Sequence, residues 1–315
     1  MAQEEYQIPI FLINGQLDSG KTRFITDTIE MGQFDDAEKK LLIVLEDGDE
    51  EYDEKMLADH KIDMVMLDKE DFTKEKLEEL DKQYDPWLVI VEYNGFMDPN
   101  LIFELEKPRG WEVYQSITLF DASSFANQWA NMKSILAETV KKADMAIFNR
   151  CKSSMELGSW RRAMRALNGG IQIYFEDEKG EQMSIADQLP YSLDDDVIEI
   201  DDNDYGIWYM DVNERPEAYK GKIVKFKGQV LKNKYFKDKN FVPGRQVMTC
   251  CAADTQFIGY IAFYDQISKL ESKQWVTVTA EIGYEFQMAY KKKGPVLHCK
   301  EVVPATAPAQ EIVSF

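Results

Sequence analysis

Near its N-terminus the chain carries the segment Gly15–Thr22, GQLDSGKT, which fits the pattern G-x-x-x-x-G-K-[ST]. An apolar run of strand length, Ile8–Ile13, precedes it, and Arg23–Glu30 can form a helix after it. In that strand–loop–helix setting the pattern predicts a phosphate-binding loop, because glycines let backbone N–H groups face phosphate oxygens and a helix N-terminus favours anions. The residues expected to cradle phosphate are Gly15, Asp18, Ser19, Gly20, Lys21 and Thr22.

The first half of the chain alternates apolar runs with segments of helical length, such as Lys74–Tyr84 and Trp129–Lys142. The runs are apolar throughout, as in strands that are buried on both faces. This order predicts an α/β fold: a mostly parallel P-loop NTPase sheet with helices on both faces. The six expected strands are Ile8–Ile13, Leu41–Leu45, Trp87–Val91, Ile117–Phe120, Met145–Phe148 and Ile171–Phe175.

The alternation stops near residue 185, and we expect residues 1–190 to form the nucleotide-binding domain. Acidic clusters in 191–218 indicate a solvated linker, with room for a short strand at Val197–Ile200. Residues 219–315 are rich in β-forming segments and predict a small barrel, with the five-stranded OB type favoured. The expected strands are Lys222–Leu231, Arg245–Cys250, Phe257–Phe263, Gln274–Gly283 and Pro295–Val303, with one short helix at Tyr264–Leu270.

The net charge of the chain limits the kinds of molecule that it is expected to bind. The chain of 315 residues has a formal net charge of −20, which disfavours non-specific nucleic-acid binding and docking on anionic lipid. No apolar run approaches the roughly 20 residues of a membrane span, so direct membrane insertion is not expected. Four cysteines in a chain of this length predict reduced thiols and a cytoplasmic location.

Two acidic residues follow expected strands at the edge where the phosphate loop lies. Glu92 ends the third run, where a carboxylate can hold the water shell of Mg²⁺ beside the Thr22 hydroxyl. Lys21 is expected to reach the β- and γ-phosphates, and Gly95 can offer a backbone N–H to the γ-phosphate. Glu46 opens an acidic cluster after the second run, where either a nucleotide-sensing switch or a solvated loop fits. Lys21, Glu92 and Glu46 are the catalytic candidates.

The fifth run ends in Asn149-Arg150-Cys151-Lys152. Guanine-specific enzymes carry N-K-x-D at this place, and the Asp accepts two hydrogen bonds from the base. Asn149 is present and Arg150 can stack on the base, but the ammonium of Lys152 has donors only. The expected nucleotide is GTP or GDP, and ATP remains an alternative.

These pieces in this order resemble the CobW-type GTPases, relatives of the GTPases that help insert nickel into urease and hydrogenase. The likeness covers about residues 7–176 and includes a switch segment at Leu45–Asp53 and E-x-x-G-x-x-D-P at Glu92–Pro99. The resemblance implies Mg²⁺-dependent GTP hydrolysis coupled to zinc- or cobalt-type metal homeostasis or metallochaperone work. It also implies a protein client or metal recipient, and it admits a homodimer.

The chain departs from that family in its metal motifs. Members usually carry C-x-C-C about twenty residues beyond the switch aspartate, and this chain has no cysteine there. It also has only two histidines, His60 and His298. Thiolate metal binding inside the first domain is therefore not expected.

Three of the four cysteines lie in the expected barrel, within R-x-x-x-x-C-C-A-A-D and a later His-Cys pair. This segment is similar to a soluble domain of uncharacterised bacterial proteins associated with a predicted permease. Thiolate and imidazole groups suit Zn²⁺, but core packing of the thiols or a redox pair fits the same residues. The candidate zinc ligands are Cys250, Cys251, His298 and Cys299.

Two alternatives to a nucleotide hydrolase stay open. A nucleotide-dependent binding module or scaffold would hold a ligand on the barrel with little turnover. A nucleic-acid partner is not expected from the total charge, although a basic stretch with Tyr235 and Phe236 between its lysines admits one. Its lysines are Lys220, Lys222, Lys225, Lys227, Lys232, Lys234, Lys237 and Lys239.

Overall fold

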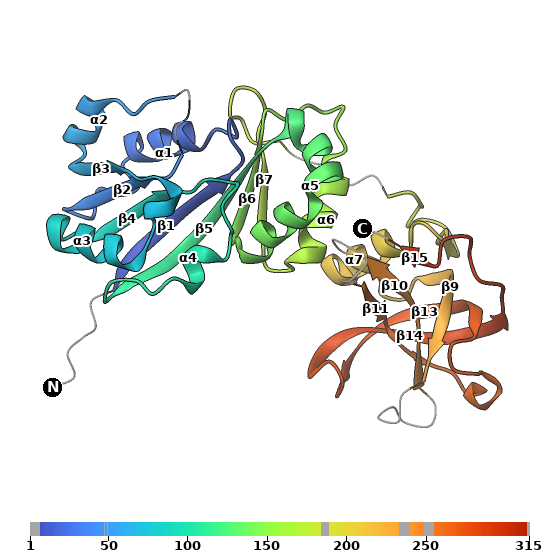
Figure 1. Cartoon of the computed structure of the whole chain (residues 1–315). Coiled ribbons are helices and arrows are strands. Elements are labelled where there is room, and N and C mark those ends of the chain that lie inside the picture. Colours follow the sequence, from blue (N-terminus) through green and yellow to red (C-terminus); the bar gives the residue numbers. More distant parts are fainter. Residues whose placement is uncertain are drawn as a thin grey trace. The chain divides into compact units, whose positions relative to one another are not determined.

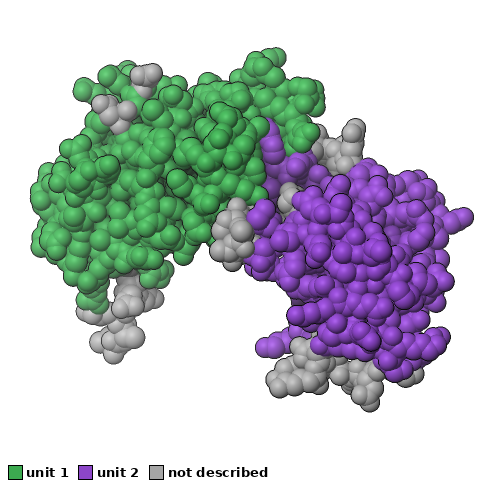
Figure 2. All heavy atoms as spheres, turned by 45° about the vertical axis from the view of Figure 1, so that its right-hand side comes forward, with its two compact units in different colours: residues 1–157, 167–185 green, residues 158–166, 186–315 purple. Residues whose placement is uncertain are grey.

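The computed structural model describes residues 7–46, 48, 50–183, 189–232, 240–248 and 255–313. The chain divides into two compact units, which are coloured separately in Figure 2. The first unit comprises residues 1–157 and 167–185, and the second comprises residues 158–166 and 186–315. Each unit has a hydrophobic core of its own.

The first unit is built on a seven-stranded sheet in the order β3-β2-β4-β1-β5-β6-β7 (Figure 1). Every neighbouring pair in this sheet is parallel. The strands are β1 (Ile8–Gly15), β2 (Lys40–Val44), β3 (Ile62–Met66), β4 (Leu88–Glu92), β5 (Trp111–Asp121), β6 (Met145–Asn149) and β7 (Gln172–Phe175). The predicted parallel α/β sheet is confirmed.

Helices cover both faces of this sheet (Figure 1). Ile25 and Ile29 of α1 pack with Leu57 of α2 against one face. Leu77 and Leu80 of α3 pack against the other face, as does Ile102 of α4. Successive residues of a central strand therefore all meet apolar side chains, which explains the uninterrupted apolar runs. The helices of this unit are α1 (Lys21–Glu30), α2 (Glu54–Asp59), α3 (Lys74–Tyr84), α4 (Leu101–Glu104) and α5 (Ala122–Lys142), with a 3₁₀ turn at Lys69–Asp71.

Strand β3 was not among the expected strands. It lies at the edge of the sheet, and Met64 and Met66 are partly exposed while Asp63 faces solvent. An edge strand needs no second apolar face, so its sequence IDMVM lacks the continuous apolar run by which the central strands are recognised.

The second unit contains a closed five-stranded barrel in which β9, β10, β12, β14 and β13 pair in a ring and β13 returns to β9. The predicted small barrel is confirmed. Its strands are β9 (Ile223–Leu231), β10 (Asn240–Met248), β12 (Ile261–Phe263), β13 (Trp275–Gln287) and β14 (Lys292–Pro304). Short strands extend it, namely β8 (Ile198–Glu199), β11 (Thr255–Gly259) and β15 (Ile312–Val313), and a 3₁₀ turn lies at Ile267–Lys269.

The segment 191–218 is not a solvated linker. It contains β8, α7 (Tyr205–Glu214) and the start of α8 (Pro216–Tyr219). Tyr205 and Trp208 are buried in the core of the second unit, where the Trp208 ring lies 4.8 Å from that of Phe226. The acidic clusters that precede this helix obscure its apolar character in the sequence.

The second unit also takes in residues 158–166 of α6 (Leu157–Leu167), which lies between β6 and β7 in chain order. Arg165 of this helix forms an ion pair of 3.1 Å with Glu214 at the end of α7. None of the helices in the described parts of the chain is long and apolar enough to cross a bilayer.

Trp208→Ala should lower the free energy of unfolding of the second unit by about 3–5 kcal/mol, because it empties a fully buried indole site. Urea unfolding followed by circular dichroism measures this change. Met288→Ala, at a strongly exposed side chain, is the matched control and should change little. A Trp208→Ala variant as stable as this control would contradict the placement of α7 in the core.

Candidate active site

The loop between β1 and α1 curls tightly around the Lys21 side chain. Asp18 and Gly20 both adopt left-handed backbone angles, with φ of 61° and 86°. The Lys21 ammonium donates to the carbonyls of Gly15 and Gln16, each at 3.0 Å. These contacts form the expected phosphate loop, with its lysine held inside the curl.

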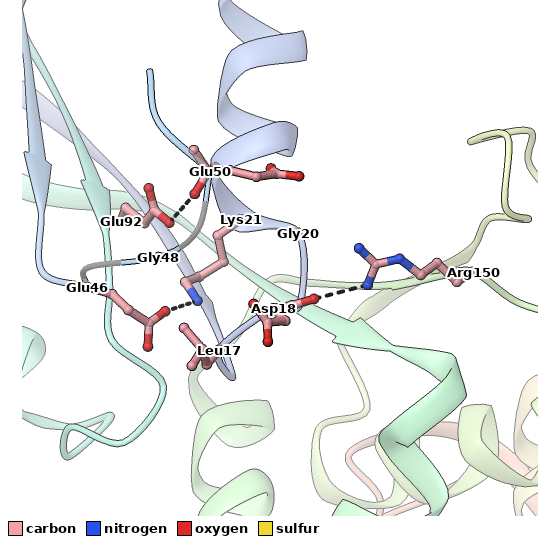
Figure 3. Close-up of a pocket in the computed structure, with 10 residues that line it drawn as sticks. Leu17, Asp18, Gly20, Lys21, Glu46, Gly48, Glu50, Glu92 and Arg150 are labelled. Carbon is pink, nitrogen blue, oxygen red and sulfur yellow. Dashed lines mark hydrogen bonds and ion pairs between the residues drawn. The ribbon is translucent and has the colours of Figure 1, made fainter. Parts of the chain in front are cut away.

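Lys21 also forms a close ion pair with Glu46, which directly follows the end of β2 (Figure 3). Lys21 is only 3% exposed, and an ammonium this deeply buried is destabilising unless oxygen atoms surround it. Glu46 supplies the negative charge that compensates the buried Lys21 ammonium.

Glu92 comes from the end of β4 and lies beside Thr22. The Thr22 hydroxyl donates to Glu92 Oε1 at 2.8 Å, and the Tyr52 hydroxyl donates to the other carboxylate oxygen. Burial raises the pKa of Glu92 and outweighs these two hydrogen bonds, which act in the opposite direction. The two oxygen-bearing side chains expected to hold Mg²⁺ are thus brought together, and carboxylate and hydroxyl oxygens suit that ion.

Gly95 is packed against the backbone of the phosphate loop. A Cβ at this position would lie 2.3 Å from the Gly15 carbonyl oxygen and 2.8 Å from Gln16 Cα. The Gln16 side chain donates to the Gly95 carbonyl oxygen at 2.9 Å. Only glycine fits this approach, and it fixes the loop after β4 against the loop after β1.

The loop after β6 is fastened to the phosphate loop by two side chains. Asn149 donates to the Ser19 carbonyl at 2.7 Å. Arg150 donates to the Asp18 carbonyl at 3.0 Å (Figure 3). Arg150 also pairs with Asp121 at 2.7 Å. Although burial opposes the shift, hydrogen bonds from Ser123 and the Arg150 guanidinium lower the pKa of Asp121.

Of these groups, Lys21, Glu46, Glu92 and Arg150 lie around one cavity of about 250 Å³ (Figure 3). Three strand ends and the phosphate loop contribute to its wall, as the carboxyl ends of parallel strands do in open α/β sheets. Its lining consists of Leu17, Asp18, Gly20, Lys21, Thr22, Glu46, Gly48, Glu50, Glu92 and Arg150.

Two participants were not among the candidates. Tyr52 lies within the switch segment Leu45–Asp53 and Asp121 ends β5, but sequence spacing assigns no contact to either. Tyr52 bonds Glu92 from 40 positions away, and Asp121 orients Arg150 from 29 positions away. Only the folded sheet makes these pairs neighbours.

The candidate zinc ligands are not brought together in the described residues. Cys250 and Cys251 lie outside these residues. His298 faces outward, where it bonds Glu285 at 2.7 Å and stacks on Phe263, while Cys299 packs against the barrel core. No group of three or more His, Cys, Asp or Glu side chains in the described parts of the chain is arranged to hold a metal ion.

Three described lysines of the basic stretch, Lys225, Lys227 and Lys232, have oxygen partners within the second unit. Lys225 pairs with Glu199 at 2.8 Å, and Lys227 pairs with Asp202 at 3.0 Å. Lys232 donates to the Ile267 carbonyl at 3.0 Å. The charges of Lys225 and Lys227 are thus partly neutralised, and the Lys232 ammonium is held by a backbone carbonyl. Lys234, Lys237 and Lys239 lie outside the described residues.

Gly95→Ala should displace the phosphate loop and lower the free energy of unfolding by about 1–3 kcal/mol, since the new methyl group has no room. Chemical denaturation and hydrogen exchange of the loop amides measure both effects. Gly169→Ala, where an added Cβ meets nothing within 4 Å, is the control. Unchanged exchange in Gly95→Ala would contradict the close approach.

Cys299 should resist alkylation in the folded protein, because burial raises the pKa of its thiol to about 12. Near pH 8 we expect iodoacetamide to modify it at least about a hundredfold more slowly than in urea-unfolded chain, since the thiolate is the nucleophile. Peptide mass spectrometry measures the rate at Cys299 itself. Equal rates in the two states would show that the thiol is not part of the core.

Several solved structures are similar in fold to part of this chain. The hydrogenase maturation factor HypB from Archaeoglobus fulgidus is 16% identical, with 57% of this chain and 86% of that chain covered at a TM-score of 0.41. The Zn(II)-bound YjiA GTPase from E. coli is 17% identical, with 75% and 85% covered at a TM-score of 0.42. At these values the likeness carries no functional argument.

Comparison by sequence is more specific. No curated protein matches the chain, but residues 174–313 match the DUF1980 C-terminal domain. Residues 9–175, more than half of the chain, match the CobW/HypB/UreG nucleotide-binding domain and include the whole phosphate loop. The chain therefore belongs to the CobW/HypB/UreG family of nucleotide-binding proteins and carries a DUF1980 C-terminal domain after its P-loop domain.

Proposed function

We propose that this protein is a Mg²⁺-dependent nucleoside triphosphatase that hydrolyses GTP and couples nucleotide state to metal handling. The observation that carries the hydrolase proposal is the convergence of Lys21, Thr22, Glu46 and Glu92 on one cavity beside the phosphate loop. Phosphoryl transfer requires mainly positioning and charge stabilisation, and this cavity offers both.

Two anionic groups could pair with the Lys21 ammonium: the Glu46 carboxylate and the phosphates of a bound nucleotide. In this structure Lys21 pairs with Glu46. A bound triphosphate would place phosphate oxygens in the same cavity, and these carry more negative charge than one carboxylate. Lys21 would then bind phosphate and release Glu46, so that the segment after β2 responds to the nucleotide, as order–disorder switches do.

The side chains also fit a magnesium ion. Thr22 and Glu92 would hold it, since their oxygens are 2.8 Å apart and both residues line the cavity. When bound, Mg²⁺ neutralises charge on the phosphates. Tyr52 would orient Glu92 through its hydrogen bond, and Gly95 would keep the β4 loop close to the phosphates.

The metal-handling part of the proposal rests on family membership. Cys250 and Cys251 supply the thiols for it, with zinc or cobalt as the metal class and a protein client or recipient as the partner. The barrel would receive that partner. We assign it to the OB type because β12 and β14 pair in parallel while the other ring pairs are antiparallel. The cytoplasm is the proposed location.

Lys21→Ala should abolish tight nucleotide binding and reduce GTP hydrolysis by about a hundredfold or more, because it removes the cation that faces the phosphates. Fluorescent GDP and ADP analogues measure binding with and without Mg²⁺, and phosphate release measures turnover. Lys179→Ala, on an exposed turn, is the control.

The same binding and turnover assays distinguish a GTP hydrolase from an ATP hydrolase and from a nucleotide-regulated scaffold. A preference for ADP and ATP would keep the triphosphatase but exclude GTP specificity. Tight binding of GTP without turnover would favour a nucleotide-regulated scaffold. If the native protein binds neither nucleotide, the hydrolase proposal fails.

A further inference from the structure

The chain lacks a carboxylate where guanine-specific enzymes have one, since Lys152 occupies that position. We propose that Glu178, from the turn after β7, supplies this carboxylate and that Lys152 holds it in place. The Lys152 ammonium lies 3.0 Å from Glu178 Oε1. This inference rests on the proposed function, because it concerns the base of the nucleotide that the cavity would bind.

The loop that contains Lys152 is fixed relative to the phosphate site. Asn149 and Arg150 bond the carbonyls of Ser19 and Asp18, and Arg150 adopts a left-handed conformation with φ of 53°. A nucleotide whose phosphates lie in the phosphate loop would therefore have its base beside the loop Asn149–Lys152. Lys152 lies two residues beyond Arg150, and the ion pair brings Glu178 beside it.

Backbone hydrogen bonds tie this loop to the end of β7. The Cys151 N–H donates to the Glu176 carbonyl at 2.8 Å, and the Glu176 N–H donates to the Phe148 carbonyl at 2.8 Å. The Cys151 side chain is buried beneath them. Residues 152 and 178 are thus held on neighbouring, mutually bonded segments.

Glu178 lies on a turn that is already ordered. Asp177 Oδ1 accepts from the N–H groups of Lys179 and Glu181 at 2.8 and 2.9 Å. Gly180 allows the turn to close, with φ of 81°. A carboxylate on such a preorganised turn loses little freedom when it binds a ligand.

Glu176 is the neighbouring carboxylate and is less suited to this role. It is half-buried, and burial together with the negative charge of Asp27 raises its pKa. Glu178 is exposed over 66% of its side chain and has a cation beside it, so it presents a charged acceptor at the surface where a base would arrive.

The pair matches the hydrogen-bonding edge of guanine. A carboxylate has two acceptor oxygens and can accept from both the N1–H and the N2 amine of guanine, while an ammonium can donate to O6. Adenine offers one N–H group on that edge and leaves one carboxylate oxygen without a partner. The arrangement therefore favours guanine, with Arg150 available to stack on the ring.

Glu178→Gln should weaken binding of a fluorescent GDP analogue by about tenfold or more and leave the ADP analogue unchanged, because the carboxamide accepts at only one atom. Xanthosine diphosphate, which carries an oxygen in place of the N2 amine, should bind the variant better than the native protein. Glu181→Gln, on the same turn, is the control and should behave like the native protein. Glu178 and Glu181 are both exposed, so both variants should fold normally. An unchanged unfolding temperature checks this.

A second variant tests the assignment by rescue. Lys152→Asp in the Glu178→Gln background returns a carboxylate to the position used in guanine-specific enzymes, and it should restore the preference for GDP over ADP. GDP affinity that is equal in Glu178→Gln, Glu181→Gln and the native protein would overturn this inference but leave the proposed function standing. Native protein that binds neither GDP nor ADP would overturn both.

Discussion

The buried ammonium of Lys21 is the group around which the site is organised. It is almost fully removed from water, so its charge must be compensated by oxygen atoms from the protein or from a ligand. The phosphate loop supplies two carbonyls and β2 supplies Glu46. In the proposed function a phosphate takes the place of this carboxylate, so the need of Lys21 for negative charge would also favour nucleotide binding.

The parallel sheet brings the groups that compensate the Lys21 charge close to it. The carboxyl ends of β1, β2 and β4 lie side by side, so Lys21, Glu46 and Glu92 meet although they are far apart in the sequence. Gly95 lets the β4 loop approach the phosphate loop closely. The central strands that carry these residues are deeply buried in the first unit.

The second unit is organised differently. Its barrel is completed by α7, whose Tyr205 and Trp208 contribute aromatic rings to the core. A sequence that places several aspartates directly before such a helix resembles a linker because local charge dominates the pattern. Buried rings four residues or fewer apart on one helix still gain enough from burial to order the segment. The composition of a short segment does not reveal whether its acidic charge or the burial of its aromatic rings decides the structure.

The amino-acid sequence alone determined the phosphate loop, the central strands and the positions of Lys21, Thr22, Glu46, Glu92, Asn149 and Arg150, because each follows from local spacing and from strands buried on both faces. Only the tertiary structure decided which partners these residues meet. Tyr52 beside Glu92, Asp121 beside Arg150 and Glu178 beside Lys152 are pairs 26 to 40 positions apart. Local pattern carries no information about such contacts, since they arise only when the parallel strands align their ends and bring the following loops together.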